Sequence, residues 1–390
     1  MPKPVMAVSV RGVMILITWM TRKLRSCWKG TGKHMPHWSI LEGDCRIQLQ
    51  DQPPSSVDAV VTDPPYEIGF LNRGWDKAGA AFNPQLWAEV WRVTKPGGHL
   101  LAFSGTRTYH RMVMAIEQAG WDIRDQLAWV YSSGFPKSLN VQKAMAAAGH
   151  PSGDWEGWGT ALKPSWEPIV MARKPLDGRT VAENVMKWGT GGLNVDGCRV
   201  PYASDRDKGH MMKAKWHVNP SHIRDDSPGF VTSNKAGDVL DGADFTHPLG
   251  RWPGNIIHDG SQMVLDLFPG DGDQSASRFF YCPKASKQER ELGLDGLDDR
   301  ILNRTNPGGM EHDPKWAPRI RKNNHPTVKP VALMKYLVRL VTPAGGLVLD
   351  PFCGSGSTGV AALQLGHDFL GCEMNPDYLD IIRARLGAVT

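Results

Sequence analysis

Short apolar runs of strand type alternate with segments of helical periodicity at both ends of this chain. The run Val57-Asp58-Ala59-Val60-Val61 lies between a polar loop and a pair of prolines, and residues 331–341 place Leu333, Leu337 and Leu340 on one helical face. Strands that alternate with helices favour a parallel sheet covered on both faces. We therefore predict an α/β fold with a doubly wound, mostly parallel sheet.

The same patterns give approximate positions for the elements. Strands are expected near residues 38–41, 57–61, 99–104, 126–131, 167–172, 346–349 and 368–372, and helices near 84–94, 109–119, 331–341, 357–365 and 376–386. Between about 175 and 324 the periodic segments vanish, and glycine, proline and aspartate are frequent. We predict four parts: a leader at 1–34, one half of the main domain at 35–174, a loop-rich insert at 175–324 and the other half at 325–390.

The leader is basic, whereas the rest of the chain is slightly acidic. It carries seven Lys and Arg side chains and no acid, so the net charge of +5 becomes −2 without it. Overall charge therefore gives no argument for a nucleic-acid partner. Its apolar stretch from 5 to 20 is interrupted by Arg11 and is shorter than the roughly 20 residues of a spanning helix. We expect a leader that is disordered or not native; a basic arm and a targeting signal are the alternatives.

The six cysteines are scattered along the chain and form no Cys-x-x-Cys pair. No zinc site is expected from this spacing, and no metal is expected elsewhere. So few cysteines in 390 residues fit a reducing cytoplasm.

A glycine-rich turn follows the strand expected at 346–349. It reads Asp350-Pro351-Phe352-Cys353-Gly354-Ser355-Gly356, and Glu373 follows the next strand. Glycines in such a turn let the backbone approach a ligand closely, and an acid at the next strand end suits ribose hydroxyls. Taken alone, the spacing fits S-adenosylmethionine (SAM), a dinucleotide, or a turn that only packs helix on strand.

A second motif, Asp63-Pro64-Pro65-Tyr66, directly follows the strand at 57–61. The exocyclic amine of a base is a poor nucleophile because its lone pair is conjugated into the ring. A carboxylate from Asp63 and the carbonyl of Pro64 could accept its two N–H groups and localise that lone pair, while two prolines stiffen the turn. Tyr66 offers a ring on which an extruded base can stack. We predict these four residues as catalytic.

Together the two motifs resemble the SAM-dependent amino-methyltransferases of DNA in the circularly permuted order called the beta class. In that order the catalytic motif comes first, a target-recognition region follows, and the cofactor motif comes last. The resemblance implies a seven-stranded Rossmann-like sheet with an inserted recognition region. Within His325-Pro326-Thr327-Val328-Lys329-Pro330 it implies that Thr327 and Lys329 lie near the methionine end of SAM. The implied cofactor-binding residues are Asp44, Thr327, Lys329, Asp350, Phe352, Gly354, Gly356 and Glu373.

The implied activity is methylation of adenine N6 in duplex DNA by base flipping and direct in-line transfer, as in restriction-modification systems. Cytosine N4 is the nearest alternative, and Asp63 leans to adenine because Ser is commoner in the cytosine enzymes. RNA or protein-glutamine methyltransferases and an inactive DNA-binding scaffold are less favoured. Residues 134–138 and 163–168 look like phage and prophage members. The triplet Glu183-Asn184-Val185 copies one from carbon-5 cytosine enzymes, but no Pro-Cys dipeptide accompanies it, so we treat it as chance.

Candidate DNA contacts are cations beside aromatic residues or in local clusters, since phosphates attract cations and bases stack on rings. They are Arg73, Trp75, Arg251, Arg278, Lys315, Arg319, Arg321 and Lys322. Double-stranded DNA is the expected partner; a homodimer is one option for the assembly, and the oligomeric state stays open. The recognition sequence and the presence of a nuclease partner stay open.

Overall fold

The computed structural model describes residues 35–68, 76, 78–134, 138–202, 247–268, 287–302 and 319–390. The described residues from Pro36 onward belong to one compact unit. The leader and four predicted DNA contacts (Arg73, Trp75, Arg278 and Lys315) lie outside the described residues. Within the part that is described, no helix combines the length and apolar character needed to cross a bilayer.

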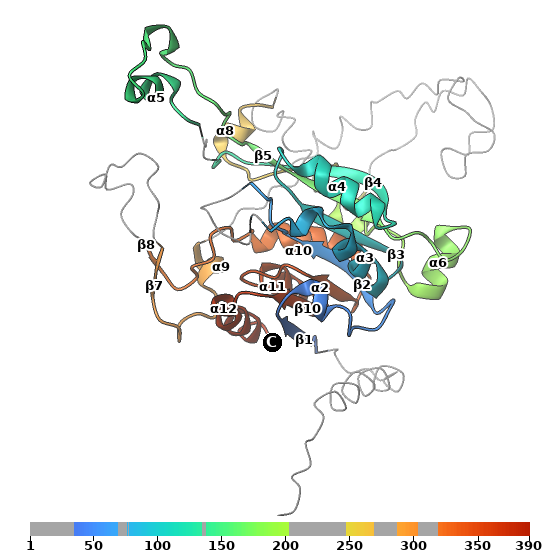
Figure 1. Cartoon of the computed structure of the whole chain (residues 1–390). Helices are drawn as coiled ribbons and strands as arrows, with labels where there is room; N and C mark the ends of the chain where they lie inside the picture. Colours follow the sequence, from blue (N-terminus) through green and yellow to red (C-terminus); the bar gives the residue numbers. More distant parts are fainter. Residues whose placement is uncertain are drawn as a thin grey trace, which may run out of the picture. The chain divides into compact units, whose positions relative to one another are not determined.

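Eight strands form one mixed, mostly parallel sheet (Figure 1). They are β1 (Trp38–Glu42), β2 (Val57–Thr62), β3 (Thr94–Phe103), β4 (Asp122–Val130), β5 (Trp166–Arg173), β6 (Ile256–His258), β9 (Leu347–Asp350) and β10 (Asp368–Glu373). Their order is β1-β10-β9-β2-β3-β5-β4-β6, and β5 alone runs antiparallel to its neighbours in this sheet. A separate pair joins β7 (Arg300–Leu302) to β8 (Arg319–Arg321).

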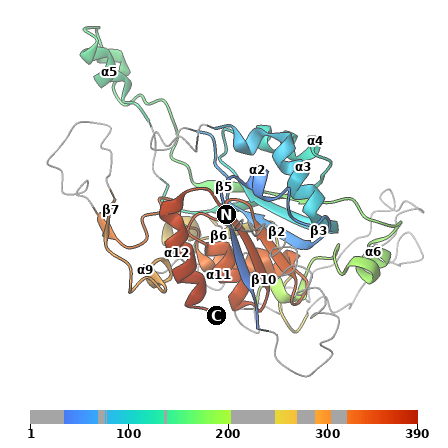
Figure 2. The same cartoon turned by 60° about the horizontal axis from the view of Figure 1, so that its bottom comes forward.

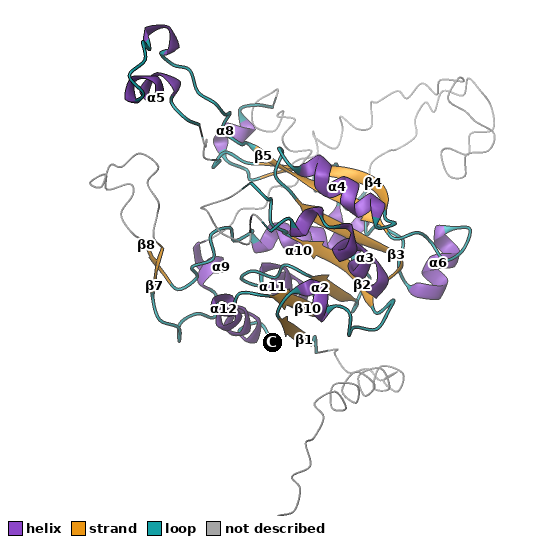
Figure 3. Cartoon of the chain, in the orientation of Figure 1, coloured by secondary structure: helices purple, strands orange, loops and turns teal. Residues whose placement is uncertain are grey.

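Helices cover both faces of the large sheet, as the purple and orange layers of Figure 3 show. The α-helices are α2 (Cys45–Gln48), α3 (Pro84–Val93), α4 (Tyr109–Gln118), α5 (Val141–Ala147), α6 (Val181–Trp188), α8 (Gln262–Leu265), α9 (Lys287–Glu291), α10 (Val331–Val341), α11 (Ser357–Gln364) and α12 (Pro376–Gly387). Short 3-10 turns are η3 (Ala80–Phe82), η4 (Gly153–Trp155) and η5 (Asp196–Cys198).

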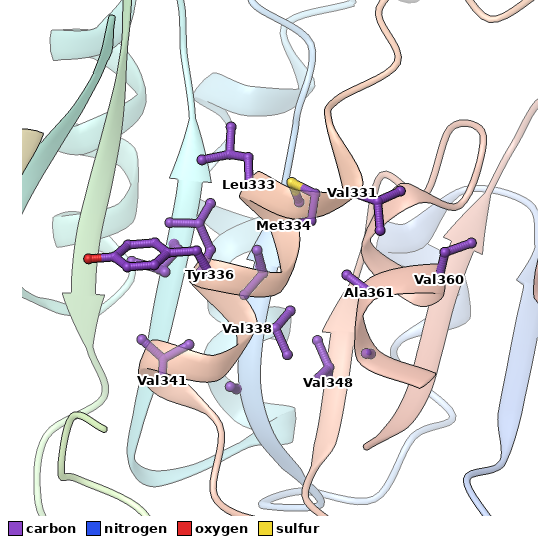
Figure 4. Packing of buried hydrophobic residues seen from close by; sticks show 14 of the residues in the cluster. Val331, Leu333, Met334, Tyr336, Val338, Val341, Val348, Val360 and Ala361 are labelled. Carbon is purple, nitrogen blue, oxygen red and sulfur yellow. The ribbon is translucent and has the colours of Figure 1, made fainter. Parts of the chain in front are cut away.

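Two separate apolar clusters hold these layers together. One packs α10 and α11 against one face of the sheet, with Leu333, Leu337, Val348 and Val360 fully buried. Figure 4 shows side chains from α10, α11 and β9 meeting in this cluster. The other packs α3 and α4 against the opposite face, and Figure 2 shows these helices from a second side. The result is a three-layer arrangement that the alternating sequence pattern predicted.

The strand order reverses between β9 and β2. The chain leaves β9 through α11 to reach β10 on one side, and leaves β2 through α3 to reach β3 on the other. Both strands point the same way, because β2 and β9 are parallel. A crevice opens at the carboxyl ends of strands at such a switch point, and ligands bind there in open α/β sheets.

The predicted fold class is confirmed, but the sheet has eight strands instead of seven. The additional strand is β6, which pairs with β4 over Ala128–Val130. It comes from a stretch that we assigned to the insert, where so short a strand gives too little pattern to reveal pairing with a distant strand.

Candidate active site

Two sequence-distant motifs are fastened together at the switch point by Asp350. Thr62 Oγ1, at the end of β2, donates to Asp350 Oδ1 at 2.6 Å, and Thr358 Oγ1 of α11 donates to Oδ2 at 2.5 Å. The backbone N–H of Phe352 donates to Oδ1 at 3.0 Å. Burial raises the pKa of Asp350 to about 6, against the effect of these donors. The carboxyl therefore joins the strand that carries Asp63 to the turn that carries Gly354.

A cavity of about 1130 Å³ opens at this junction. It exceeds the roughly 300–1,000 Å³ of ordinary ligand pockets, so it has room for a cofactor and part of a second substrate. The structure brings together here all four predicted catalytic residues and seven of the eight predicted cofactor residues. The lining includes Asp44, Asp63, Pro64, Pro65, Tyr66, Thr327, Lys329, Asp350, Phe352, Gly354 and Glu373.

The two carboxylate oxygens of Asp63, a residue of the cavity wall, have different surroundings. Its Oδ2 accepts from Lys329 Nζ at 2.6 Å. Its Oδ1 is buried and meets no donor among the described residues. A buried acceptor without a partner costs free energy unless a ligand or water supplies a donor. Burial raises the pKa of Asp63, whereas the charge of Lys329 lowers it.

Hydrogen bonds hold Tyr66 through both its hydroxyl and its backbone carbonyl. Its hydroxyl donates to Glu167 Oε2 at 2.8 Å and accepts from Lys329 Nζ at 3.2 Å. Its backbone carbonyl accepts from Thr108 Oγ1 at 2.7 Å. Burial raises the pKa of Tyr66 well above its ordinary value, so the hydroxyl keeps its proton. These contacts fix a tyrosine ring in the wall of the cavity.

The glycine turn is built for close approach. Gly354 has φ +56°, and its backbone N–H donates to Glu373 Oε2 at 2.7 Å. A Cβ at Gly354 would meet His325 Nε2 at 2.8 Å. Gly356, with φ +79°, is the N-cap of α11 and is the one predicted cofactor residue that does not line the cavity. Its role is to turn the chain into the helix.

Glu373 lies at the end of β10, beside the turn. Its Oε1 accepts from the backbone N–H of Asn375 at 2.7 Å. Burial raises the pKa of Glu373 to about 7. Asp44, at the end of the neighbouring β1, accepts from the backbone N–H of Arg46 at 2.9 Å and forms an ion pair with that side chain. Hydrogen bonding to Arg46 lowers the pKa of Asp44.

Four cations in the cavity lining were not singled out in the sequence: Arg46, Arg107, Lys163 and Arg290. The predicted DNA contacts that are described lie elsewhere. Arg251 is only 6% exposed and lies over the ring of Tyr202 at 4.8 Å, so it is not a surface cation. Lys322 Nζ donates to the carbonyl of Asp295, and Arg321 is half-buried. Arg319 is described only through its backbone in β8.

Tyr131 and Glu167 also line the cavity and were not predicted as site residues. Tyr131 follows β4, and its hydroxyl donates to Glu167 Oε1 at 3.1 Å. Glu167 is the second residue of β5, in a strand that is otherwise largely apolar. The sequence did offer one signal for Glu167, namely a carboxylate at the start of an otherwise apolar strand.

A doubly wound fold with a glycine turn, a buried acid and a proline-stiffened carboxylate around one cavity defines an enzyme that holds a small cofactor beside a second substrate. The chain belongs to the N6/N4 family of DNA methylases, which matches residues 57–384. It is therefore a DNA amino-methyltransferase whose acceptor is adenine N6 or cytosine N4.

Relatives by sequence are type II methyltransferases. M.HindIII of Haemophilus influenzae is 24% identical over 397 residues, which cover 89% of this chain and 94% of that protein. M2.DpnII of Streptococcus pneumoniae is 45% identical over 74 residues, which cover 19% of this chain and 26% of that protein.

Two solved structures show a weak likeness. The cytosine-N4-specific PvuII DNA methyltransferase is 14% identical with a TM-score of 0.46, covering 91% of this chain and 90% of its own. A DNA modification methylase of Thermus thermophilus, complexed with S-adenosyl-L-methionine, is 18% identical with a TM-score of 0.42, covering 90% of this chain and 94% of its own.

Proposed function

We propose that this chain methylates N6 of adenine in duplex DNA, with SAM as the methyl donor. The observation that carries the proposal is that Asp63 lines the same cavity as the glycine turn, while its buried Oδ1 has no hydrogen-bond partner among the described residues. An amine donor from a base would satisfy this oxygen. Asp at the first position of the motif favours adenine over cytosine.

The cavity fits SAM on the side of the glycine turn. Gly354 lines the cavity and has no side chain, so a ligand can approach its backbone closely. Glu373, at the next strand end, supplies a carboxylate for ribose hydroxyls, and Asp44 and Thr327 line the same cavity. When bound, SAM supplies an electrophilic methyl group on a sulfonium centre.

The residues of the second motif act on the acceptor base. Asp63 Oδ1 and the carbonyl of Pro64 accept hydrogen bonds from the two amine protons, which localises the nitrogen lone pair. The Tyr66 ring stacks on a base that has left the duplex; one such stack returns about 1–3 kcal/mol of the few kcal/mol that extrusion costs. Holding both reactants in one cavity provides much of the rate acceleration.

The DNA surface is proposed to surround the cavity mouth. Arg107 and Lys163 are cations that line the cavity, and we propose that they contact the backbone of the flipped nucleotide. The predicted contacts outside the described residues stay predictions, as do the homodimer, the four-part domain division and the cytoplasmic location.

The test is expression in a host that lacks DNA methylation, followed by sequencing that distinguishes N6-methyladenine from N4-methylcytosine. We expect N6-methyladenine at one short sequence motif. Asp63→Ala should reduce transfer by at least about 10²-fold, because it removes an acceptor used in the transition state. SAM affinity, measured by calorimetry, should stay near the wild-type value.

The matched control is Asp51→Ala, an exposed aspartate outside the cavity, which should leave methylation unchanged. N4-methylcytosine in place of N6-methyladenine would overturn the choice of base. Full methylation by Asp63→Ala would overturn the proposed role of the carboxylate.

A further inference from the structure

Glu167 connects the catalytic motif to three proton donors. Its Oε2 accepts from Tyr66 at 2.8 Å and lies 3.4 Å from Lys329 Nζ, while its Oε1 accepts from Tyr131 at 3.1 Å. The side chains of Glu167 and Lys329 are only 16% and 9% exposed. Ile169, Val170 and Ala172 of the same strand belong to the apolar clusters, whereas Glu167 and Lys329 line the cavity.

Burying charges is costly unless they are paired and hydrogen-bonded. The group formed by Asp63, Glu167 and Lys329 holds two carboxylates and one ammonium. Lys329 alone would neutralise Asp63 at 2.6 Å and draw its charge away from the substrate. A second carboxylate shares the ammonium and leaves a net negative charge in the cavity wall. The acceptor nitrogen gains positive charge as it forms its new bond, and a negative wall stabilises that charge.

We propose that Glu167 is a positioning residue for methyl transfer, which acts through Lys329 and the Tyr66 hydroxyl to aim Asp63 Oδ1 at the acceptor amine. The proposal rests on the proposed function and assigns to Lys329 a second contact besides the one expected with the cofactor. Through Lys329, Glu167 fixes which oxygen of Asp63 is occupied. Through Tyr66, it fixes the plane on which the base stacks.

A role of Glu167 in packing alone, without electrostatic coupling to Asp63, would leave the titration of Asp63 unchanged. The groups that face this site are Lys329, Tyr66, Tyr131 and Asp350, in addition to the two carboxylates. The negative charge of Glu167 raises the pKa of Asp63 and that of Lys329. Removing this charge should therefore lower both pKa values, and both limbs of the pH profile should move to lower pH.

The test compares Glu167→Gln with Glu167→Asp in the full chain. We expect Glu167→Gln to lower kcat by about 10²-fold, the usual cost of misplacing a reacting group, with little change in KM for DNA. Both limbs of its kcat profile should shift to lower pH. Glu167→Asp keeps the charge and should keep the wild-type pH profile. Glu156→Gln, an exposed glutamate, is the matched control and should behave as wild type.

A second measurement needs no turnover. The Asp63 carboxyl, followed by carbon NMR in selectively labelled protein and assigned with Asp63→Asn, should titrate at lower pH in Glu167→Gln than in wild type. An unshifted titration together with wild-type kcat overturns the proposal. A loss of thermal stability and SAM affinity without any shift also overturns it, in favour of a structural role. The wild-type protein could fail to methylate DNA although the Asp63 carboxyl titrates at lower pH in Glu167→Gln. In that case the proposed function fails, whereas the coupling of Glu167 to Asp63 stands.

Discussion

Gly354 is the residue at which backbone conformation and ligand access meet. Replacing it with alanine adds a Cβ at φ +56° that would lie 2.8 Å from His325 Nε2, in a ring already packed against Tyr378 at 4.7 Å. We expect Gly354→Ala to lose about 1 kcal/mol of stability from the left-handed conformation. The displaced His325 should also weaken SAM binding about tenfold, measured by calorimetry.

Gly345→Ala is the matched control for this variant. Gly345 has φ +66°, and a Cβ there meets nothing within 4 Å. It should lose similar thermal stability and keep wild-type SAM affinity. Equal SAM affinities in the two variants would show that the turn at Gly354 does not approach the cofactor.

Residues within one motif were predictable, whereas contacts between elements were not. Asp63 and Gly354 could be identified because their motifs directly follow strands, and parallel strands end at one edge. Glu167 could not, because its strand runs antiparallel and brings its first residues to that same edge. Strand direction is decided by pairing with β3 and β4, which no local pattern encodes. The contact between Lys329 and Asp63 was also not predictable, because it joins residues that are far apart in the sequence.

At the scale of elements, most of the expected helices and strands are present, but β3 begins at Thr94 and not at residue 99, where the sequence placed its start. Helix α10 has the bounds 331–341 that its apolar face predicts. The triplet around Asn184 has a structural explanation: Glu183 completes a capping box with Thr180, and Asn184 donates to the carbonyls of Pro96 and Thr190. Helix α5 has no buried side chain, so its sequence shows no apolar periodicity from which a helix could be predicted.

Helix α5 and the turn η4 form an arm between β4 and β5, and both views place α5 away from the sheet (Figures 1 and 2). None of the α5 side chains is buried, and Trp155 and Trp158 pack on each other while 40% and 59% exposed. Asn140 and Gly159 pair at its base. Replacing residues 141–158 with a two-residue Asn-Gly turn should therefore change the melting temperature by no more than about 2 °C.

The comparison is Asn184→Ala in α6, a helix of similar length. Asn184 is fully buried and also accepts from the backbone N–H of Asp177 at 2.9 Å. Its loss should cost about 2–3 kcal/mol, because buried backbone groups lose their partners. A larger loss of stability from the arm deletion than from Asn184→Ala would mean that the arm packs against the domain.

At the scale of the whole molecule, strands from opposite ends of the chain are neighbours in the sheet. β1 pairs with β10 along its whole length, and the backbone N–H of His37 donates to Asp368 Oδ1 at 2.9 Å. The motif order predicted that β2 and β9 would meet. It did not show that the N-terminal strand closes the edge beside Glu373, because the strand at 38–41 has too few residues to specify a partner.

Because β1 pairs with β10, truncations before and after β1 can test the leader and the edge strand separately. A chain that starts at Met35 keeps β1 and every cavity residue described above, so its thermal stability and kcat should equal those of the full chain. A chain that starts after Asp44 loses all of β1, the ion pair of Glu42 with Arg383, and Asp44 from the cavity wall. It should be less stable and should bind SAM more weakly, measured by thermal unfolding and calorimetry.

DNA affinity over a range of salt concentrations distinguishes a leader that binds DNA as a basic arm from a leader that makes no contact with DNA. A basic arm with seven Lys and Arg residues that contacts phosphates would make DNA binding of the full chain more salt-dependent than that of the chain starting at Met35. Equal salt dependence in both would show that the leader makes no contact with DNA.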